Sequence, residues 1–246
     1  MTSNRTKLIT AGIIIAILAI SIFLVLELGL NGLNTFFIEN FDGTSLDTAK
    51  WLVLENTDYS GAPAYGGSVK IADGHIDLSS DGPSFPFVCS LQDPFPTSGN
   101  FEFEFTVEYT CIADYASRVG ISNAAPYEGG KWNGMDLIDV KADDIGNEAT
   151  AIRINFFGTE VYKSTVQGFK PSAPEHIFKV NYINGTYTLY ADGIFVAEKQ
   201  SFERPNTIFL GSPPKPGVPI SPENWEQWGY WGWSSFKVDY IRVVAR

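Results

Sequence analysis

Short alternating runs of apolar and polar residues, separated by Gly, Pro, Asn and Asp, fill the chain from residue 36 onward. The pattern is clearest in FEFEFTVEY (101–109), where every odd position is apolar and the even ones include Glu102, Glu104 and Glu108. Successive side chains of a strand point to opposite faces, so this period predicts a strand with a buried face and a solvated face that holds the glutamates. Repeated along the chain, it predicts a sandwich or barrel of many strands.

Two turn sequences predict a three-stranded meander over residues 176–199. They are Asn184-Gly185 and Asp192-Gly193, pairs that favour tight hairpins because both turn positions need positive φ. Asn184-Gly185-Thr186 is also an N-glycosylation sequence, although the turn accounts for Asn-Gly without a glycan. Residues 211–233 break the rhythm of short strands. Five prolines between 213 and 222 exclude a regular helix or a central strand and predict a long, stiff loop there.

The N-terminal segment has a different pattern. Residues 8–26 form an uncharged apolar run that spans nearly 30 Å as a helix, the thickness of a bilayer core. Arg5 and Lys7 precede it, which predicts a cytoplasmic N-terminus at 1–7, a transmembrane signal anchor at 8–30, a linker at 31–36 and an exported domain at 37–246. A cleaved signal peptide is the alternative, but the run is long and no A-x-A-like site follows it.

Composition supports a folded exported domain. Aromatic residues make up 14% of the 246 residues and charged residues 18%, a balance typical of packed β-structure and not of disorder. The net charge of −11 argues against nucleic acid or anionic lipid surfaces as partners of the domain, since both need a cationic face. Cys89 and Cys111 lie in strand-like runs and predict one disulfide if adjacent strands bring them together. Two buried thiols are the alternative.

Three segments carry a family resemblance. FDGTSLDTAKW (41–51), YTLYADGIFV (187–196) and FKVDYIRV (236–243) together resemble the concanavalin A-like lectin/glucanase superfamily, over about residues 37–246. That superfamily includes laminarinase-type glycoside hydrolases and many carbohydrate-binding modules. The resemblance implies an all-β jelly roll of two curved antiparallel sheets, with ligands bound on the concave face.

The resemblance also implies where catalysis would lie. Laminarinase-like hydrolases carry Glu-x-Asp-x-Glu on one strand, or the same motif with one extra residue, which requires a bulge to keep both carboxyls on one face. This chain lacks the motif, so no catalytic residue is predicted. The nearest segment, GMDLIDVKADD (134–144), holds Asp136 and Asp139 three positions apart, which a regular strand would point to opposite faces. A lyase-like site built on Tyr with Arg or Lys stays open.

The last predicted strand suggests a calcium site. Read as one regular strand, FKVDYIRV places Phe236, Val238 and Tyr240 on one face and Asp239 with two β-branched residues on the other, so Asp239 needs a partner. In the family, an aspartate at this point often helps to hold a structural Ca²⁺ with oxygens from the N-terminal segment. Glu39 or nearby carbonyls would supply them here. Ordinary hydrogen bonding is the alternative.

Aromatic residues suggest a sugar site. Trp225, Trp228, Tyr230, Trp231 and Trp233 lie within nine residues, and Trp132 stands apart from them. Flat rings stack on sugar faces and carboxylates accept hydroxyl hydrogen bonds, so Trp132, Trp225 and Trp228 are the candidate exposed platform, with Asp136 and Asp139 as polar partners.

These observations favour a carbohydrate-binding or adhesion module without catalysis, single-pass in the cell membrane, with its C-terminal domain outside the cytoplasm. A divergent polysaccharide-cleaving hydrolase or lyase and a purely structural cell-envelope domain are the alternatives.

Overall fold

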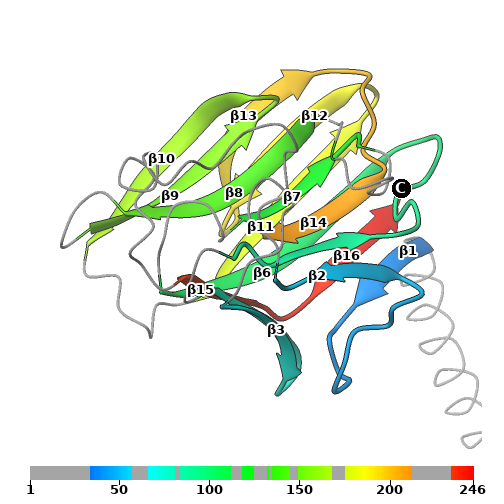
Figure 1. The fold of residues 1–246 in the computed structure, drawn as a ribbon. Coiled ribbons are helices and arrows are strands. Elements are labelled where there is room, and N and C mark those ends of the chain that lie inside the picture. Colours follow the sequence, from blue (N-terminus) through cyan, green and yellow to red (C-terminus); the bar gives the residue numbers. More distant parts are fainter. Residues whose placement is uncertain are drawn as a thin grey trace, which may run out of the picture.

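The computed structural model describes residues 34–56, 66–80, 84–111, 118–124, 132, 135–144, 149–167, 175–211 and 234–246. The predicted anchor at 8–30 and most of the proline- and tryptophan-rich segment, with Trp225 and Trp228, lie outside these ranges. Within them, we find no helix of the length and apolar character that a bilayer crossing requires. The described ranges contain the strands of two antiparallel sheets (Figure 1).

The larger sheet has nine strands. Seven follow the order β13-β12-β11-β6-β15-β4-β3, while β16 continues beside β6 and carries β1 on its other edge. The bounds are β1 (Asn34–Glu39), β3 (Gly67–Ala72), β4 (His75–Ser80), β6 (Phe101–Cys111), β11 (His176–Ile183), β12 (Thr186–Ala191), β13 (Ile194–Gln200), β15 (Ser234–Val238) and β16 (Ile241–Ala245). β1 begins at Asn34, so pairing starts inside the range predicted to be a linker.

The smaller sheet has seven strands in the order β10-β9-β8-β7-β14-β5-β2. Their bounds are β2 (Trp51–Leu54), β5 (Phe87–Ser90), β7 (Arg118–Ser122), β8 (Asp136–Asp144), β9 (Ala149–Phe156), β10 (Thr159–Gln167) and β14 (Thr207–Gly211). The two sheets pack face to face, and one hydrophobic core takes alternate residues from both, such as Phe103 of β6 and Ile154 of β9. The predicted all-β sandwich is therefore confirmed.

The turn predictions are also confirmed. β11, β12 and β13 form the meander, and its two turns have positive φ at both central residues: 50° and 82° at Asn184-Gly185, 51° and 76° at Asp192-Gly193. The odd positions of β6 face the core, as the alternation predicts: Phe101, Phe103, Phe105, Val107 and Tyr109 are all buried.

The C-terminal strand differs from its prediction. The segment expected to be one regular strand is two, β15 and β16, which follow each other along the same edge of β6. Strand pairing is interrupted at Asp239 and Tyr240, and the alternation changes phase there, because Val238 and Ile241 both lie in the core. The single-strand interpretation, with Asp239 and Ile241 on one face, was therefore wrong. Asp239 is half-buried, and its backbone N–H donates to Thr106 Oγ1 at 3.1 Å.

The two cysteines belong to different sheets. Cys89 lies in β5, which pairs with β2 and β14, whereas Cys111 ends β6. They therefore do not lie on hydrogen-bonded neighbouring strands, although the disulfide prediction assumed that they do. Cys89 packs with Phe87 and Phe209 in a small cluster separate from the main core. The side chain of Cys111 lies outside the described set, so the bridge itself stays a prediction.

Candidate functional site

The face of the seven-stranded sheet that points away from the core carries a polar cluster. In β7, Val119 and Ile121 enter the core, so Arg118, Gly120 and Ser122 lie on the opposite face. In β8, the same alternation puts Asp139 on that outer face, opposite Gly120 in the register. In β9 it adds Asn155, opposite Asp139. Neighbouring strands thus bring polar side chains from three segments together.

A bulge in β8 brings the two predicted aspartates to one face. Ile121 of β7 pairs with Ile138, but the next residue, Ser122, pairs with Asp136, so Leu137 is an extra residue. An extra residue reverses the alternation of side chains on the bulged strand. Asp136 therefore shares the outer face with Asp139, and their placement on opposite faces, expected for a regular strand, does not occur.

Arg118 connects the two aspartates. Its Nη1 lies 3.9 Å from Asp136 Oδ2 and its Nε lies 3.9 Å from Asp139 Oδ2. Both contacts exceed hydrogen-bond length, and Nε, though buried, makes no hydrogen bond in the structure. Asn155 Nδ2 donates to Asp139 Oδ2 at 3.1 Å. We call Arg118, Trp132, Asp136, Asp139 and Asn155 the Arg118 cluster.

Trp132 joins this cluster through its indole nitrogen. Nε1 donates to Asp136 Oδ1 at 3.1 Å, which places the ring beside the aspartates, as the sequence suggested. The ring, however, is only 6% exposed and packs edge-on against Phe87 and Phe209. The expectation that Trp132 forms an exposed platform was therefore wrong. It orients Asp136 and contributes to an apolar wall next to the charges.

Gly120 permits this packing. A Cβ at that position would lie 2.4 Å from the backbone oxygen of Ile138 and 2.6 Å from Cζ of Phe209. The ring of Phe209 therefore occupies the space beside Gly120 that any other residue would fill. The apolar wall extends over β7 only because this strand carries glycine at this point.

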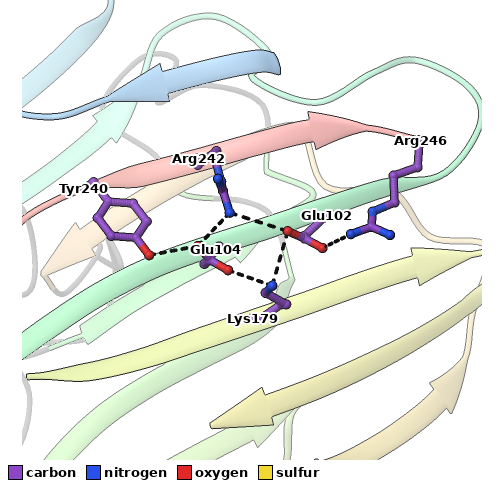
Figure 2. A network of polar contacts seen from close by, with 6 residues as sticks. All are labelled: Glu102, Glu104, Lys179, Tyr240, Arg242 and Arg246. Carbon is purple, nitrogen blue, oxygen red and sulfur yellow. Dashed lines mark hydrogen bonds and ion pairs between the residues drawn. The ribbon is translucent and has the colours of Figure 1, made fainter. Parts of the chain in front are cut away.

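A second polar cluster lies on the outer face of the nine-stranded sheet (Figure 2). Glu102 and Glu104 of β6 were expected on a solvated face, but they are only 4% and 7% exposed. Cations from the strands on both sides of β6 cover them. Lys179 Nζ of β11 lies 2.9 Å from Glu104 and 3.4 Å from Glu102, and Arg242 Nη2 of β16 lies 2.8 Å and 3.7 Å from the same two carboxylates.

Two further side chains complete this cluster. Tyr240 donates its hydroxyl to Glu104 Oε1 at 2.8 Å, and Arg246 pairs with Glu102. We call these six residues the Glu102–Glu104 network. The hydrogen bond to Lys179 is the largest of the interactions that lower the pKa of Glu104, and they outweigh the effect of burial; the same hydrogen bond raises the pKa of Lys179. The ion pair of Glu104 and Lys179 is thus held in its charged form around neutral pH.

The two predicted calcium ligands each have other partners in the structure. Both carboxylate oxygens of Glu39 accept hydrogen bonds, from the Trp51 indole at 3.1 Å and the Phe41 backbone at 3.3 Å. Asp239 instead contacts Glu175. Burial raises the pKa of Glu175 most, and the neighbouring carboxylate of Asp239 raises it further. No group of three or more metal-binding side chains occurs in the described ranges. Calcium stays a prediction, and an unchanged melting temperature in chelator would contradict it.

Sequence reasoning found two members of the Arg118 cluster as polar partners, and it missed Arg118 and Asn155. Neither residue belongs to a motif, and each enters the cluster only through strand pairing. The bulge was also invisible in the sequence. The only signal was the three-residue spacing of Asp136 and Asp139. This spacing places both side chains on one face of a strand that contains one extra, bulged residue.

Comparison with solved structures identifies the fold. An endo-beta-1,3-glucanase from Pyrococcus furiosus superimposes with a TM-score of 0.50 and 13% identity, over 87% of this chain and 94% of that chain. A beta-glucanase from Bacillus licheniformis superimposes with a TM-score of 0.51 and 16% identity, over 87% of this chain and 99% of that chain. The Emp47p carbohydrate recognition domain gives a TM-score of 0.54 at 10% identity, over 87% and 96%.

The sequence itself matches no protein-family model and no curated protein. The structural likenesses and the two antiparallel sheets nevertheless show that the chain has the concanavalin A-like jelly-roll fold, as the resemblance implied. At such low identity, the likeness shows the fold alone.

Proposed function

We propose that this protein is a carbohydrate-binding domain that holds a glycan at the Arg118 cluster without cleaving it, tethered outside the cytoplasm by the N-terminal anchor. The observation that carries the proposal is the combination of charged and apolar groups on one face of a jelly roll. The fold is shared with glucanases and with a carbohydrate recognition domain, which supports a sugar over other small ligands.

The chemistry of the cluster suits sugar hydroxyls. Arg118 supplies N–H donors whose 3.9 Å contacts with the aspartates are longer than hydrogen bonds, and the two aspartates supply acceptors. The side chains of Arg118 and Asp136 are 15% and 16% exposed, so the cluster is reached from solvent at this edge. A few fixed polar groups beside apolar rings are the usual composition of a small-ligand site.

The place of Arg118 supports binding without cleavage. Retaining hydrolysis needs one carboxylate as nucleophile and a second carboxyl group that is protonated and donates its proton to the leaving group. The guanidinium group of Arg118 lies 3.9 Å from both Asp136 and Asp139, so the two carboxylates share one cationic neighbour and its position does not distinguish a nucleophile from an acid. The arrangement is better suited to holding a ligand than to proton transfer.

The β8 bulge supports hydrolysis as a second candidate. It puts two carboxylates with one extra residue between them on one face, which is the geometry that the longer form of the family motif requires. The glutamates of that motif are replaced by shorter aspartates. A divergent hydrolase therefore needs a role for Arg118 beyond charge compensation, such as contact with substrate.

A glycan array followed by an assay for new reducing ends separates these candidates, with the full 246-residue chain in detergent. We expect retention of a polysaccharide or oligosaccharide and no product. New reducing ends, lost in Asp139→Asn, would instead establish hydrolysis. No retention and no product would contradict both and leave a structural role in the envelope.

Two arginine variants locate the site. Arg118→Gln should abolish retention, and Arg118→Lys should restore part of it, since the charge returns without the planar fork of donors. Arg246→Gln is the matched control, because it removes an arginine that also pairs with a buried carboxylate, on the opposite sheet. Equal loss of retention in Arg118→Gln and Arg246→Gln would mean that only folding was affected.

A further inference from the structure

The turn between β11 and β12 presents an exposed asparagine at the start of an N-glycosylation sequence. Asn184 is exposed at the tip of the hairpin. Its backbone is fixed, since its N–H donates to Asn100 Oδ1 at 2.9 Å and φ is positive at Asn184 and Gly185. Thr186 follows as the first residue of β12. The side-chain amide of Asn184 therefore projects from a rigid turn.

A phenylalanine lies against the same turn. Phe202 is 86% exposed, the largest exposed fraction among the large hydrophobic residues that the structure describes. Its ring nevertheless has a fixed neighbour, because a Cβ on Gly185 would lie 2.6 Å from Cε1 of Phe202. Ser201 holds this segment in place by donating its backbone N–H to the Gly185 oxygen at 2.9 Å. One face of the ring covers Gly185, and the rest of the ring meets water.

An exposed, positioned aromatic ring beside a sequon has a specific use. Apolar ring surface in water is unfavourable, and carbohydrate rings have apolar faces that stack on aromatic side chains. Ile183, which precedes the asparagine, adds exposed apolar surface on the same hairpin. The turn explains Asn184-Gly185, and the start of β12 suits Thr186, but neither explains the uncovered phenylalanine beside them.

We propose that Asn184 is N-glycosylated and that the first sugar of the glycan packs against Phe202. In the transfer, Asn184 Nδ2 forms a bond to the anomeric carbon of a lipid-linked oligosaccharide. The bond from that carbon to the donor's phosphate oxygen breaks with its electron pair, and the amide loses one proton. The proposal rests on the predicted export of the domain and is independent of glycan binding at the Arg118 cluster.

Mass spectrometry of the Asn184 peptide tests the modification. The full chain is produced in a host that N-glycosylates exported proteins, beside two variants of Thr186. We expect a glycan mass on the native chain and on Thr186→Ser, which keeps the sequence, and none on Thr186→Val, which has nearly the same shape. An unmodified Asn184 in the native chain, or a glycan that persists in Thr186→Val, would overturn the proposal.

Thermal unfolding tests the contact with Phe202. Enzymatic removal of the glycan should lower the Tm of the native chain by about 1–4 °C, the shift expected for a stacking contact in a domain of this size. In Phe202→Ala the same treatment should leave Tm nearly unchanged. Equal shifts in both chains would show that the sugar does not pack on Phe202. Retention of glycans on an array has no bearing on either result, so the two proposals fail separately.

Discussion

The outer faces of the two sheets each hold two carboxylates that project from one strand, and they are partnered in different ways. In the Glu102–Glu104 network, Lys179, Arg242 and Tyr240 contact Glu104 at 2.8–2.9 Å, and Arg246 pairs with Glu102. In the Arg118 cluster, one arginine lies 3.9 Å from each aspartate. The carboxylates of the first set are held by short contacts, whereas those of the second lie beyond hydrogen-bond length from their arginine; Arg118 Nε and Arg242 Nε alike make no hydrogen bond in the structure.

The difference separates a structural role from a binding role. Buried charges that satisfy one another cross-link β6, β11 and β16, and a ligand would have to break strong contacts to enter. Ion pairs that are longer than a hydrogen bond leave room for a polyhydroxylated ligand to add hydrogen bonds to the same groups. Spacing along a strand does not distinguish the two cases. The groups contributed by neighbouring strands do.

The largest expected effect on stability comes from a substitution of Gly120, which lies beside the Arg118 cluster and not beside the Glu102–Glu104 network. Gly120→Ala should destabilise the protein by about 3 kcal/mol, because the new Cβ meets the Ile138 oxygen and Phe209 within 2.4–2.6 Å. Urea unfolding measures it. Gly43→Ala is the control, since its nearest contact, the Ser45 oxygen, is at 3.3 Å, and we expect a change of at most about 1 kcal/mol. Similar values would mean that Phe209 is not fixed beside the cluster.

A charge substitution in the Glu102–Glu104 network should come next. Glu102→Gln leaves Lys179 and Arg242 with Glu104 alone and removes the carboxylate that pairs with Arg246, and we expect a loss of about 2 kcal/mol. Glu160→Gln in the more exposed Arg153–Glu160 pair should cost less than about 1 kcal/mol. Chemical denaturation compares them, and glycan retention should survive in both. A loss in Glu102→Gln no larger than the control would remove the structural role from the network.

Acid should weaken the same network by a smaller amount. The pKa of Glu104 is lowered in the folded state, so the stability from its charged form is complete above the ordinary value of 4.5 and is lost as pH falls through the lowered pKa. The free energy of unfolding should therefore fall below pH 4.5, and less steeply in Glu104→Gln. Identical slopes in the native chain and the variant would contradict this assignment.

The sequence predicted the fold well because alternation and turn chemistry are local. The odd positions of β6 and the two Gly-containing turns of the meander needed no knowledge of neighbours. The fate of Glu102 depended on Lys179 and Arg242, which pair with β6 from distant parts of the chain. A solvated face and a face covered by paired charges have the same alternating sequence, so that prediction failed.

The two irregularities of the strands were unpredictable for a related reason. The bulge at Leu137 and the break at Asp239 and Tyr240 shift the alternation by one residue, and such a shift is decided by the partner strand. Asp136 and Asp139 were recognised by residue type, while their common face came only with the pairing of β7 and β8. Arg118 had no signal at all until that pairing placed it between them.

The smallest stability effect should accompany a large effect on binding. Asp139→Asn keeps an oxygen that accepts from Asn155 and removes only a charge 3.9 Å from Arg118, so stability should change by less than about 1 kcal/mol. Glycan affinity, measured by calorimetry, should fall about tenfold or more, because a charged acceptor is lost. Glu102→Gln should give the reverse, with stability lost and affinity kept. If Asp139→Asn lost more than about 2 kcal/mol of stability and kept its glycan affinity, both clusters would be structural. The contacts of Arg118 would then stabilise the fold despite their length.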